Sequence, residues 1–189
     1  MLEDGYQKGS RRDAWQVTAN GGVAGVLAVM YGLSSDPTLF VAFTASLAAA
    51  AADTWATEIG GGIGGRTVSV TTWRQVAPGT SGGVSLVGML GGLTGSIVVG
   101  VSALPWFSSP AYDLFIVAIA GFAGMLVDSL VGATLQQRYR CGVCRVITER
   151  TDHCGMSTDR YRGIRFIDND IVNLICSLAA AALAILLRC

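Results

Sequence analysis

Long apolar runs separated by short polar segments dominate this chain. A membrane-spanning helix needs roughly 20 mostly apolar residues, and five runs reach or approach that length: Val17–Leu33, Leu39–Ile59, Val84–Leu104, Leu114–Leu135 and Ile171–Leu187. Three prolines, Pro37, Pro105 and Pro110, fall between the runs, where helices should break. The pattern predicts an all-α polytopic bundle of about five transmembrane helices, with residues 1–189 forming a single integral membrane domain.

Positive charge is distributed unevenly among the connecting segments. The N-terminal tail carries three Lys or Arg residues, the loop 60–83 carries Arg66 and Arg74, the loop 136–170 carries seven arginines, and Arg188 alone lies on the other side. Lys and Arg are retained on the cytoplasmic face of membrane proteins. We therefore expect a cytoplasmic N-terminus, two cytoplasmic loops and an external C-terminus, in the plasma membrane by default.

Composition supports the membrane assignment and narrows the function classes. Hydrophobic residues make up 51% of the chain and charged residues 14%, whereas soluble domains have about 25% charged residues. The net charge is zero, so nothing suggests a nucleic-acid partner. We expect no cleaved signal peptide near the start. The glycine-rich stretch Gly60–Gly65 does not match the Walker phosphate-binding pattern.

Three acidic residues lie inside the predicted spans. Asp53 and Glu58 belong to the second span and Asp128 to the fourth. A carboxylate in hydrocarbon costs at least about 2.5 kcal/mol, so each should face the bundle interior, water, a cation or a partner. Asp53 and Asp128 lie at similar depths from the cytoplasmic side. We interpret them as a functional site, and an interhelical hydrogen bond or a pair with arginine is the structural alternative.

Other polar groups gather at the same inner ends of the predicted helices. They are Asn20, Thr80, Ser81, Gly82, Gly83, Ser85, Ser129, Thr134, Gln136, Asn169, Asp170 and Asn173. Oxygen ligands of this kind suit Mg²⁺, and helix N-termini favour phosphate. Arg66, Arg74, Arg138 and Arg140 are candidates for neutralising phosphate from the flanking loops, although each is also explained by topology or lipid contact. The set favours phosphoryl or nucleotidyl transfer to a lipid-borne acceptor.

A second group of candidate ligands lies in the loop 136–170. Cys141 and Cys144 form a Cys-x-x-Cys pair, and His153 and Cys154 follow in the same loop. Structural zinc sites use Cys₃His sets, so these four residues are candidate Zn²⁺ ligands. Their spacing is shorter than in common zinc ribbons, and adjacent residues do not readily bind one ion. Free or redox-active thiols remain the alternative.

Six sequence blocks resemble a known membrane family in the same order. They are RDAWQVTANGG (12–22), ADTWATEIG (52–60), VAPGTSGGVS (76–85), GGLTGS (91–96), DSLVGATLQ (128–136) and DNDIVN (168–173). Together they resemble the family of plant phytyl-phosphate kinase and the animal transmembrane protein nineteen, which is related to CTP-dependent lipid kinases. The resemblance covers nearly the whole chain. Relatives usually carry further hydrophobic helices before the first block.

The resemblance implies a kinase that converts an isoprenyl monophosphate, such as phytyl phosphate, to the diphosphate with CTP or ATP. It implies that Asp53, Glu58 and Asp128 hold Mg²⁺ or orient the donor. Asp170 and Asn173 would complete the oxygen shell. The residues Thr80, Ser81, Gly82 and Gly83 would lie against phosphate, with Arg66 and Arg74 as neutralising charges. Membrane lipids surround such a protein, and a homodimer is compatible with it.

Three other functions stay open. A cytidylyltransferase that forms a CDP-lipid would share the donor and the metal. A transporter or channel also places acidic residues within helices, but it predicts polar residues across the full membrane depth. The outer halves of the predicted spans are apolar here, as in residues 114–122. The remaining alternative is that the protein is a purely structural subunit of an assembly.

Overall fold

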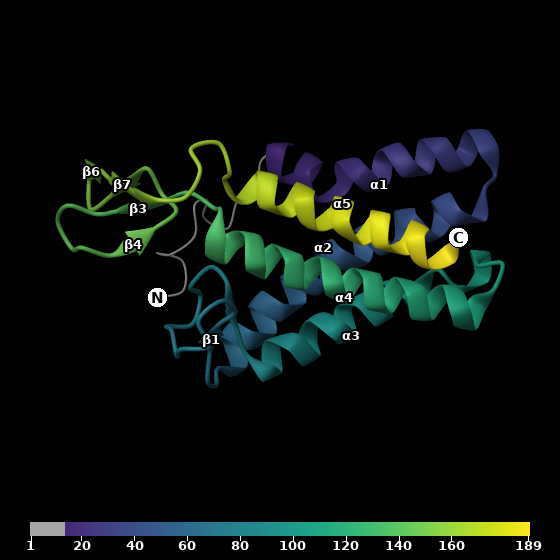
Figure 1. Cartoon of the computed structure of the whole chain (residues 1–189), viewed down its shortest axis with the longest axis horizontal. Helices are drawn as coiled ribbons and strands as arrows, with labels where there is room; N and C mark the ends of the chain where they lie inside the picture. The colour runs from purple at the N-terminus through teal and green to yellow at the C-terminus, as the bar shows by residue number, and fades with distance from the viewer. Residues whose placement is uncertain (1–13) are drawn as a thin grey trace.

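Five long helices form the body of the protein, as a computed structural model describes it for residues 14–189 (Figure 1). They are α1 (Ala14–Ser34), α2 (Pro37–Ile63), α3 (Leu86–Ser102), α4 (Pro110–Thr134) and α5 (Asn169–Arg188). Four are long and apolar enough to cross a membrane, and α3 is a shorter apolar helix. The predicted helical membrane architecture is confirmed. The tail's Lys8, Arg11 and Arg12, and the start of the first sequence block, lie outside the described residues.

The predicted helix ends differ from the structure by one to four residues, and two of these differences change the loop 60–83 and its border. The second helix continues to Ile63 instead of stopping at Ile59, so residues 60–63 are helical instead of loop. The third helix begins at Leu86 because the Ser85 side chain accepts a hydrogen bond from the Gly88 N–H at 3.0 Å and so caps it. Val84, predicted as helical, instead ends a short strand.

Helix α2 is the centre of the bundle and contacts each of the other four long helices. Its buried face consists largely of alanines, and Ala42, Ala45, Ala48 and Ala49 are fully buried. Small side chains let neighbouring backbones approach closely, which is the main source of helix association in lipid. The alanine face of α2 therefore allows neighbouring helices to pack closely against α2.

The glycines of α3 pack directly against α2. A Cβ atom on Gly92 would lie 2.4 Å from Met125 Sδ of α4 and 3.0 Å from the Ala52 carbonyl of α2. Such distances leave no room for a side chain. Glycine at this position is therefore a requirement of the three-helix contact that holds residues 52–60 beside 125–128.

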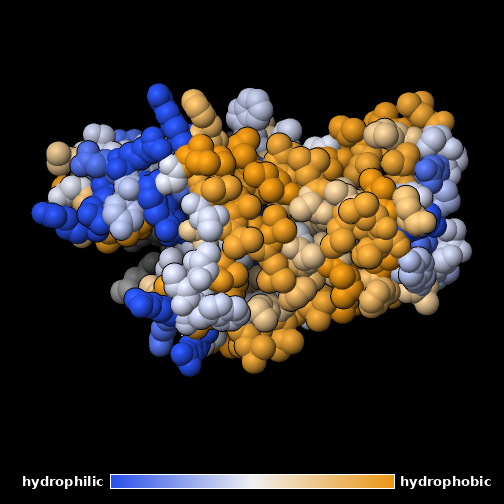
Figure 2. All heavy atoms as spheres, in the orientation of Figure 1, coloured by the Kyte–Doolittle hydropathy of each residue, from blue (hydrophilic) through white to orange (hydrophobic). Residues whose placement is uncertain are grey.

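The surface divides into an apolar belt and a polar end (Figure 2). Apolar side chains such as Val29, Leu90, Phe115 and Leu178 are exposed along the helices, as expected for a lipid-facing surface. The polar end holds both arginine-containing loops and the beginning of α1 (Figure 1). We call it the basic end, and we call the other end, where the chain finishes at Cys189, the far end.

The loops of the basic end contain short β-strands, which the helical pattern of the sequence did not predict. Strands β1 (Val68–Ser69) and β2 (Gly83–Val84) pair antiparallel. The longer loop forms a three-stranded sheet in the order β4 (Ile147–Thr148), β3 (Arg138–Arg140), β7 (Asp159–Arg162), and a hairpin of β5 (Asp152–His153) and β6 (Met156–Ser157). We call residues 138–162 the β unit.

An ion pair closes the far end of the bundle. Arg188 Nε of α5 donates to Asp113 Oδ1 of α4 at 2.9 Å, and the Asp113 side chain is fully buried. The same guanidinium donates to Thr38 of α2 at 3.1 Å and to Ser108 at 2.5 Å. The pair thus connects three helices, and an apolar core that includes Val41, Ile116 and Val117 lies beside it.

Candidate functional site

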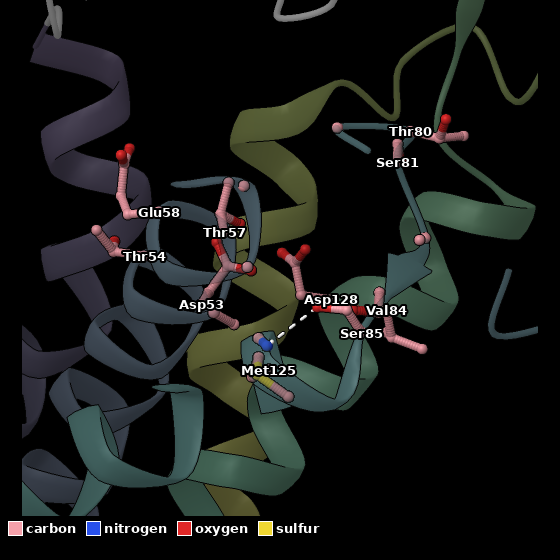
Figure 3. A pocket seen from close by; sticks show the side chains of 18 of the residues that line it. Asp53, Thr54, Thr57, Glu58, Thr80, Ser81, Val84, Ser85, Met125 and Asp128 are labelled. Carbon is pink, nitrogen blue, oxygen red and sulfur yellow. Dashed lines mark hydrogen bonds between the residues drawn. The ribbon is translucent and has the colours of Figure 1, made fainter. Parts of the chain in front are cut away.

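A cavity of about 570 Å³ opens at the basic end. Its walls come from the last turns of α2 and α4, the first turns of α3 and α5, the start of α1, and the segment Pro78–Ser85. Figure 3 shows that side chains from α2 and α4 project into the same space. The cavity is large enough for a phosphorylated ligand, since small-molecule sites usually have about 300–1,000 Å³.

Two carboxyl groups from different helices meet in this cavity. Asp53 of α2 and Asp128 of α4 both line it, and they lie close enough to interact electrostatically. Asp128 Oδ1 is buried and has no hydrogen-bond partner in the described part of the chain. Two ionised carboxylates in contact repel each other unless a proton or a cation lies between them. The arrangement therefore suits a bound cation.

The charged lining of the cavity is acidic throughout the described residues. Besides Asp53 and Asp128, it contains Glu58 of α2 and Glu149 of the β unit, and none of the described lining residues is Lys or Arg. Glu58 is five positions from Asp53, which is about 140° around a helix, and it lies toward α1 (Figure 3). An anionic ligand in this cavity needs a cation to offset these carboxylates.

A tightly packed turn forms one wall of the cavity. Gly79 and Gly82 have positive φ angles of 79° and 75°, a conformation that side chains rarely adopt. A Cβ atom on Gly82 would lie 2.3 Å from the Ala133 Cβ of α4 and 2.8 Å from the Ser129 carbonyl. The turn therefore lies directly on the end of α4. It leads into the N-terminus of α3, whose first N–H groups lack partners within the helix.

Two side chains that follow α4 fix this turn. Gln136, which is buried, accepts a hydrogen bond from the Ser81 hydroxyl at 2.7 Å. The guanidinium of Arg138 donates to the Ser81 carbonyl and, at 3.4 Å, to the Gly132 carbonyl. Burial lowers the pKa of Arg138, Arg162 lowers it further, and Glu149 opposes the shift. Arg138 therefore stabilises the wall of the cavity, and its charge does not project into the cavity.

Most of the residues predicted from sequence do meet at this cavity. The lining contains Asn20, Asp53, Glu58, Thr80, Ser81, Gly82, Gly83, Ser85, Asp128, Ser129, Gln136, Asn169 and Asn173. Six predicted residues are not part of it: Arg66, Arg74, Thr134, Arg138, Arg140 and Asp170. Arg66 and Arg74 are exposed on the loop that follows α2, and the Thr134 hydroxyl donates to the Leu130 carbonyl of its own helix.

Several lining residues escaped the sequence analysis, and Glu149 is the most important of them. It lies in the connection between β4 and β5, 21 positions from Asp128, and the β unit folds back to bring it to the cavity. Gln16 of α1 and Thr67 of the first loop also contribute. In the sequence, Glu149 lies between the pair Cys141 and Cys144 and the pair His153 and Cys154. This position was the only feature of the sequence that could have indicated a role for Glu149.

Comparison with known proteins identifies a family. The model for an integral membrane protein family, DUF92, matches residues 2–181. Protein PGR of Arabidopsis thaliana is 29% identical over 94% of this chain and 69% of its own length. An uncharacterized membrane protein of Methanocaldococcus jannaschii is 28% identical over 79% of this chain and 51% of its own length.

A further relative bears on the predicted resemblance. Protein VTE6, chloroplastic, of Arabidopsis thaliana is 26% identical over 77% of this chain and 37% of its own length. With the family model and Protein PGR, it confirms the resemblance to the phytyl-phosphate kinase family. The chain spans from about a third to about two thirds of the length of these three relatives. No solved structure matches the chain.

Proposed function

Because this chain belongs to the DUF92 family of integral membrane proteins, we propose that it is an isoprenyl-phosphate kinase acting at the cytoplasmic face of its membrane. It would transfer the γ-phosphoryl group of a nucleoside triphosphate, CTP or ATP, to a lipid monophosphate of the phytyl-phosphate type. The observation that carries this proposal is the meeting of Asp53 and Asp128 in a polar cavity with a glycine-rich wall.

The residues of the cavity fit Mg²⁺, which would neutralise phosphate charge when bound. The donor set consists of oxygen atoms, and the buried Asp128 Oδ1 has no hydrogen-bond partner among the described residues. Asp53 and Asp128 would hold the ion, with Glu58 or Glu149 at the edges of the cavity. Mg²⁺ is usually held by one or two carboxylates together with substrate phosphates. The pair formed by Asp53 and Asp128 matches that ligand set.

The chain's own groups have positioning roles in the proposed reaction. The turn at Gly82 and the N-terminus of α3 would hold phosphate oxygens through backbone N–H groups. A phosphate oxygen of the lipid attacks the γ-phosphorus, the bond to the bridging oxygen breaks, and the nucleoside diphosphate leaves. A phosphate monoester is already anionic near neutral pH, so no side chain has to remove a proton. Positioning and charge stabilisation then supply the catalysis.

The location of the cavity supports a lipid acceptor. The cavity lies at the basic end, directly beside the apolar belt of the helices (Figure 2). An isoprenyl chain would remain among the helices or lipid tails while its phosphate reached the carboxylates. An acceptor with a soluble body would not need a site placed at the membrane surface.

A product assay tests the proposal. The chain, purified in detergent with Mg²⁺, is given phytyl or geranylgeranyl monophosphate and CTP or ATP labelled at the γ-phosphate. The proposal expects label in an isoprenyl diphosphate. Label entering the lipid from α-labelled CTP, with pyrophosphate released, would instead indicate a cytidylyltransferase. No transfer with either nucleotide, while a longer family member in the same assay is active, would contradict kinase activity in this chain.

A cation-coupled transporter is the second candidate, favoured by the purely acidic charged lining of the described cavity. The far end argues against a transporter. There, the Arg188–Asp113 ion pair and an apolar core lie on the route that a transported ion would take. Cation flux through the protein in sealed proteoliposomes, dependent on Asp128 and independent of nucleotide, would favour the transporter.

A further inference from the structure

Four candidate metal ligands converge in the β unit, away from the carboxylates of the cavity. The ligand atoms of Cys141, Cys144, His153 and Cys154 all lie within 4.8 Å of one another. His153 Nδ1 is 3.4 Å from Cys144 Sγ and 3.2 Å from Cys154 Sγ. Tetrahedral zinc with Zn–S of about 2.3 Å and Zn–N of about 2.0 Å requires ligand–ligand separations of roughly 3.5–3.8 Å. The observed spacing is close to that requirement.

The backbone explains how adjacent residues can both bind one ion. Cys154 and Gly155 form the two-residue turn between β5 and β6, with φ angles of 54° and 75°. Positive φ at both turn positions is the geometry of a type I′ hairpin. In this turn conformation, Cys154 Sγ lies 3.2 Å from His153 Nδ1. A cysteine in this conformation is strained, and such strain persists where a function requires it.

The Cys-x-x-Cys pair forms a second tight turn, between β3 and β4. The Arg145 N–H donates to the Cys141 carbonyl at 3.0 Å, and Arg145 has a φ of 62°. The backbone N–H groups of Cys144 and Val143 are directed at Cys141 Sγ. The turn holds Cys141 Sγ and Cys144 Sγ close enough together to bind one ion.

Crowding of the thiols also points to a cation. The Sγ atoms of Cys141, Cys144 and Cys154 all lie within 4.8 Å of one another. Several thiolates cannot ionise together at this spacing without a positive charge between them. Cys141, Cys144 and Cys154 are all free cysteines in the structure.

The β unit has little else to hold it together. Its strands are two to four residues long, and within residues 138–162 Cys141 is the only apolar side chain in the buried core. Units this small usually need a metal or disulfides to fold. A metal joining the two turns would replace the missing core.

We propose that Cys141, Cys144, His153 and Cys154 bind one structural Zn²⁺ and that this ion fixes the segment carrying Glu149 against the cavity. Four protein ligands fill a tetrahedral shell and leave no open position, so the site is structural instead of catalytic. Glu149 lies between the two ligand pairs, five positions after Cys144 and four before His153. The ion therefore anchors both ends of the segment that brings Glu149 to the cavity. The zinc site stands whether or not the cavity transfers phosphate.

Metal analysis of the purified full chain tests the first half of the proposal. The protein is expressed in zinc-supplemented medium, purified through a tag without histidines and without chelators, and analysed by mass spectrometry for metals. We expect about one zinc per chain, lost in Cys144→Ser and in His153→Ala. Cys189→Ser, a matched exposed cysteine at the far end, should keep its zinc, and so should His153→Cys, which restores a four-ligand set. Cobalt replacement should give thiolate charge-transfer absorption with tetrahedral visible bands.

Hydrogen exchange tests the second half. Amides of residues 146–158 should exchange faster in Cys144→Ser than in the parent, while those of α2 and α4 remain protected and show that the bundle is folded. Three results would overturn the proposal: a folded parent chain without zinc or cobalt absorption, a Cys144→Ser variant with a full complement of zinc, or a Cys144–Cys154 disulfide under reducing conditions. Equal exchange of residues 146–158 with and without zinc would reject the link to Glu149.

Discussion

Each end of the bundle buries a carboxylate from α4, but in opposite electrostatic surroundings. At the far end, Asp113 pairs with Arg188 at 2.9 Å, and its other oxygen accepts the Ser109 N–H at 3.0 Å. At the basic end, Asp128 lies beside Asp53 and in the field of Glu149. A paired, fully hydrogen-bonded carboxylate is part of the structure, whereas neighbouring acids inside a cavity are arranged to receive something positive.

The same contrast appears in the packing around the two acids. The far end is filled by an apolar core that includes Ala45, Ile116 and Ala120. The basic end instead contains a cavity of about 570 Å³ with hydroxyl, amide and carboxyl side chains along its walls. One helix thus contributes to a closed end and an open end. This one-sidedness suits chemistry at the membrane surface better than a path through the membrane.

The largest expected effect comes from breaking the far-end pair. Arg188→Met leaves Asp113 buried without its cation, which typically costs about 3–5 kcal/mol. We expect a clearly lower midpoint in thermal unfolding measured in detergent, with an unchanged transfer rate per folded molecule. The double variant Arg188→Met with Asp113→Asn should recover much of the lost stability. An unchanged midpoint in the single variant would show that this pair does not hold the helices together.

The opposite result is expected at the basic end. Asp128→Asn removes a charge from the cavity and relieves the repulsion with Asp53, so stability should stay the same or rise. Transfer of the γ-phosphoryl group should fall about 10²–10³-fold, the usual cost of losing one preorganised electrostatic group. Initial rates and unfolding midpoints measured on one preparation separate the two effects. Full turnover in Asp128→Asn would remove this residue from the site.

Substitution in the turn at Gly82 should lower both the stability of the protein and its transfer rate. Gly82→Ala places a Cβ against Ala133 at 2.3 Å and keeps a φ of 75° that alanine disfavours, so the turn must move away from α4. We expect a loss of roughly 1–3 kcal/mol of stability and slower transfer. Gly62→Ala is the matched control, because a Cβ there meets nothing within 4 Å. Equal behaviour of the two variants would show that the turn tolerates displacement.

The smallest effect is expected at the loop arginines. Arg74 is exposed and lies outside the cavity lining, and exposed substitutions usually change free energies by less than about 0.5 kcal/mol. Arg74→Gln should therefore alter kcat/KM by about twofold or less. A loss of tenfold or more would mean that this loop closes over bound phosphate.

The sequence was sufficient to predict the helices and much of the cavity, for physical reasons. Apolar runs of membrane length have few alternatives, and the acids at 53 and 128 had to face the interior. Both acids line the cavity in the structure.

Features that depend on long-range folding could not be predicted. Arg138 and Arg66 look alike in sequence, yet one binds backbone carbonyls beneath the cavity and the other is exposed. Glu149 reaches the cavity only because the fold of the β unit places the connection between β4 and β5 beside it. The Arg188–Asp113 pair joins residues 75 positions apart, and a charge count by itself assigns Arg188 only to the far side.

Binding of Mn²⁺, as a paramagnetic replacement for Mg²⁺, tests the central claim most directly. Electron paramagnetic resonance on the protein in nanodiscs, with CTP or ATP present, should detect a saturable site from which Mg²⁺ displaces the ion. Asp128→Asn should weaken this binding at least about tenfold, since even outer-shell changes at metal sites cost 10–100-fold, whereas Arg74→Gln should not. Undiminished Mn²⁺ binding in Asp128→Asn would contradict the assignment of the carboxylate pair as the cation site.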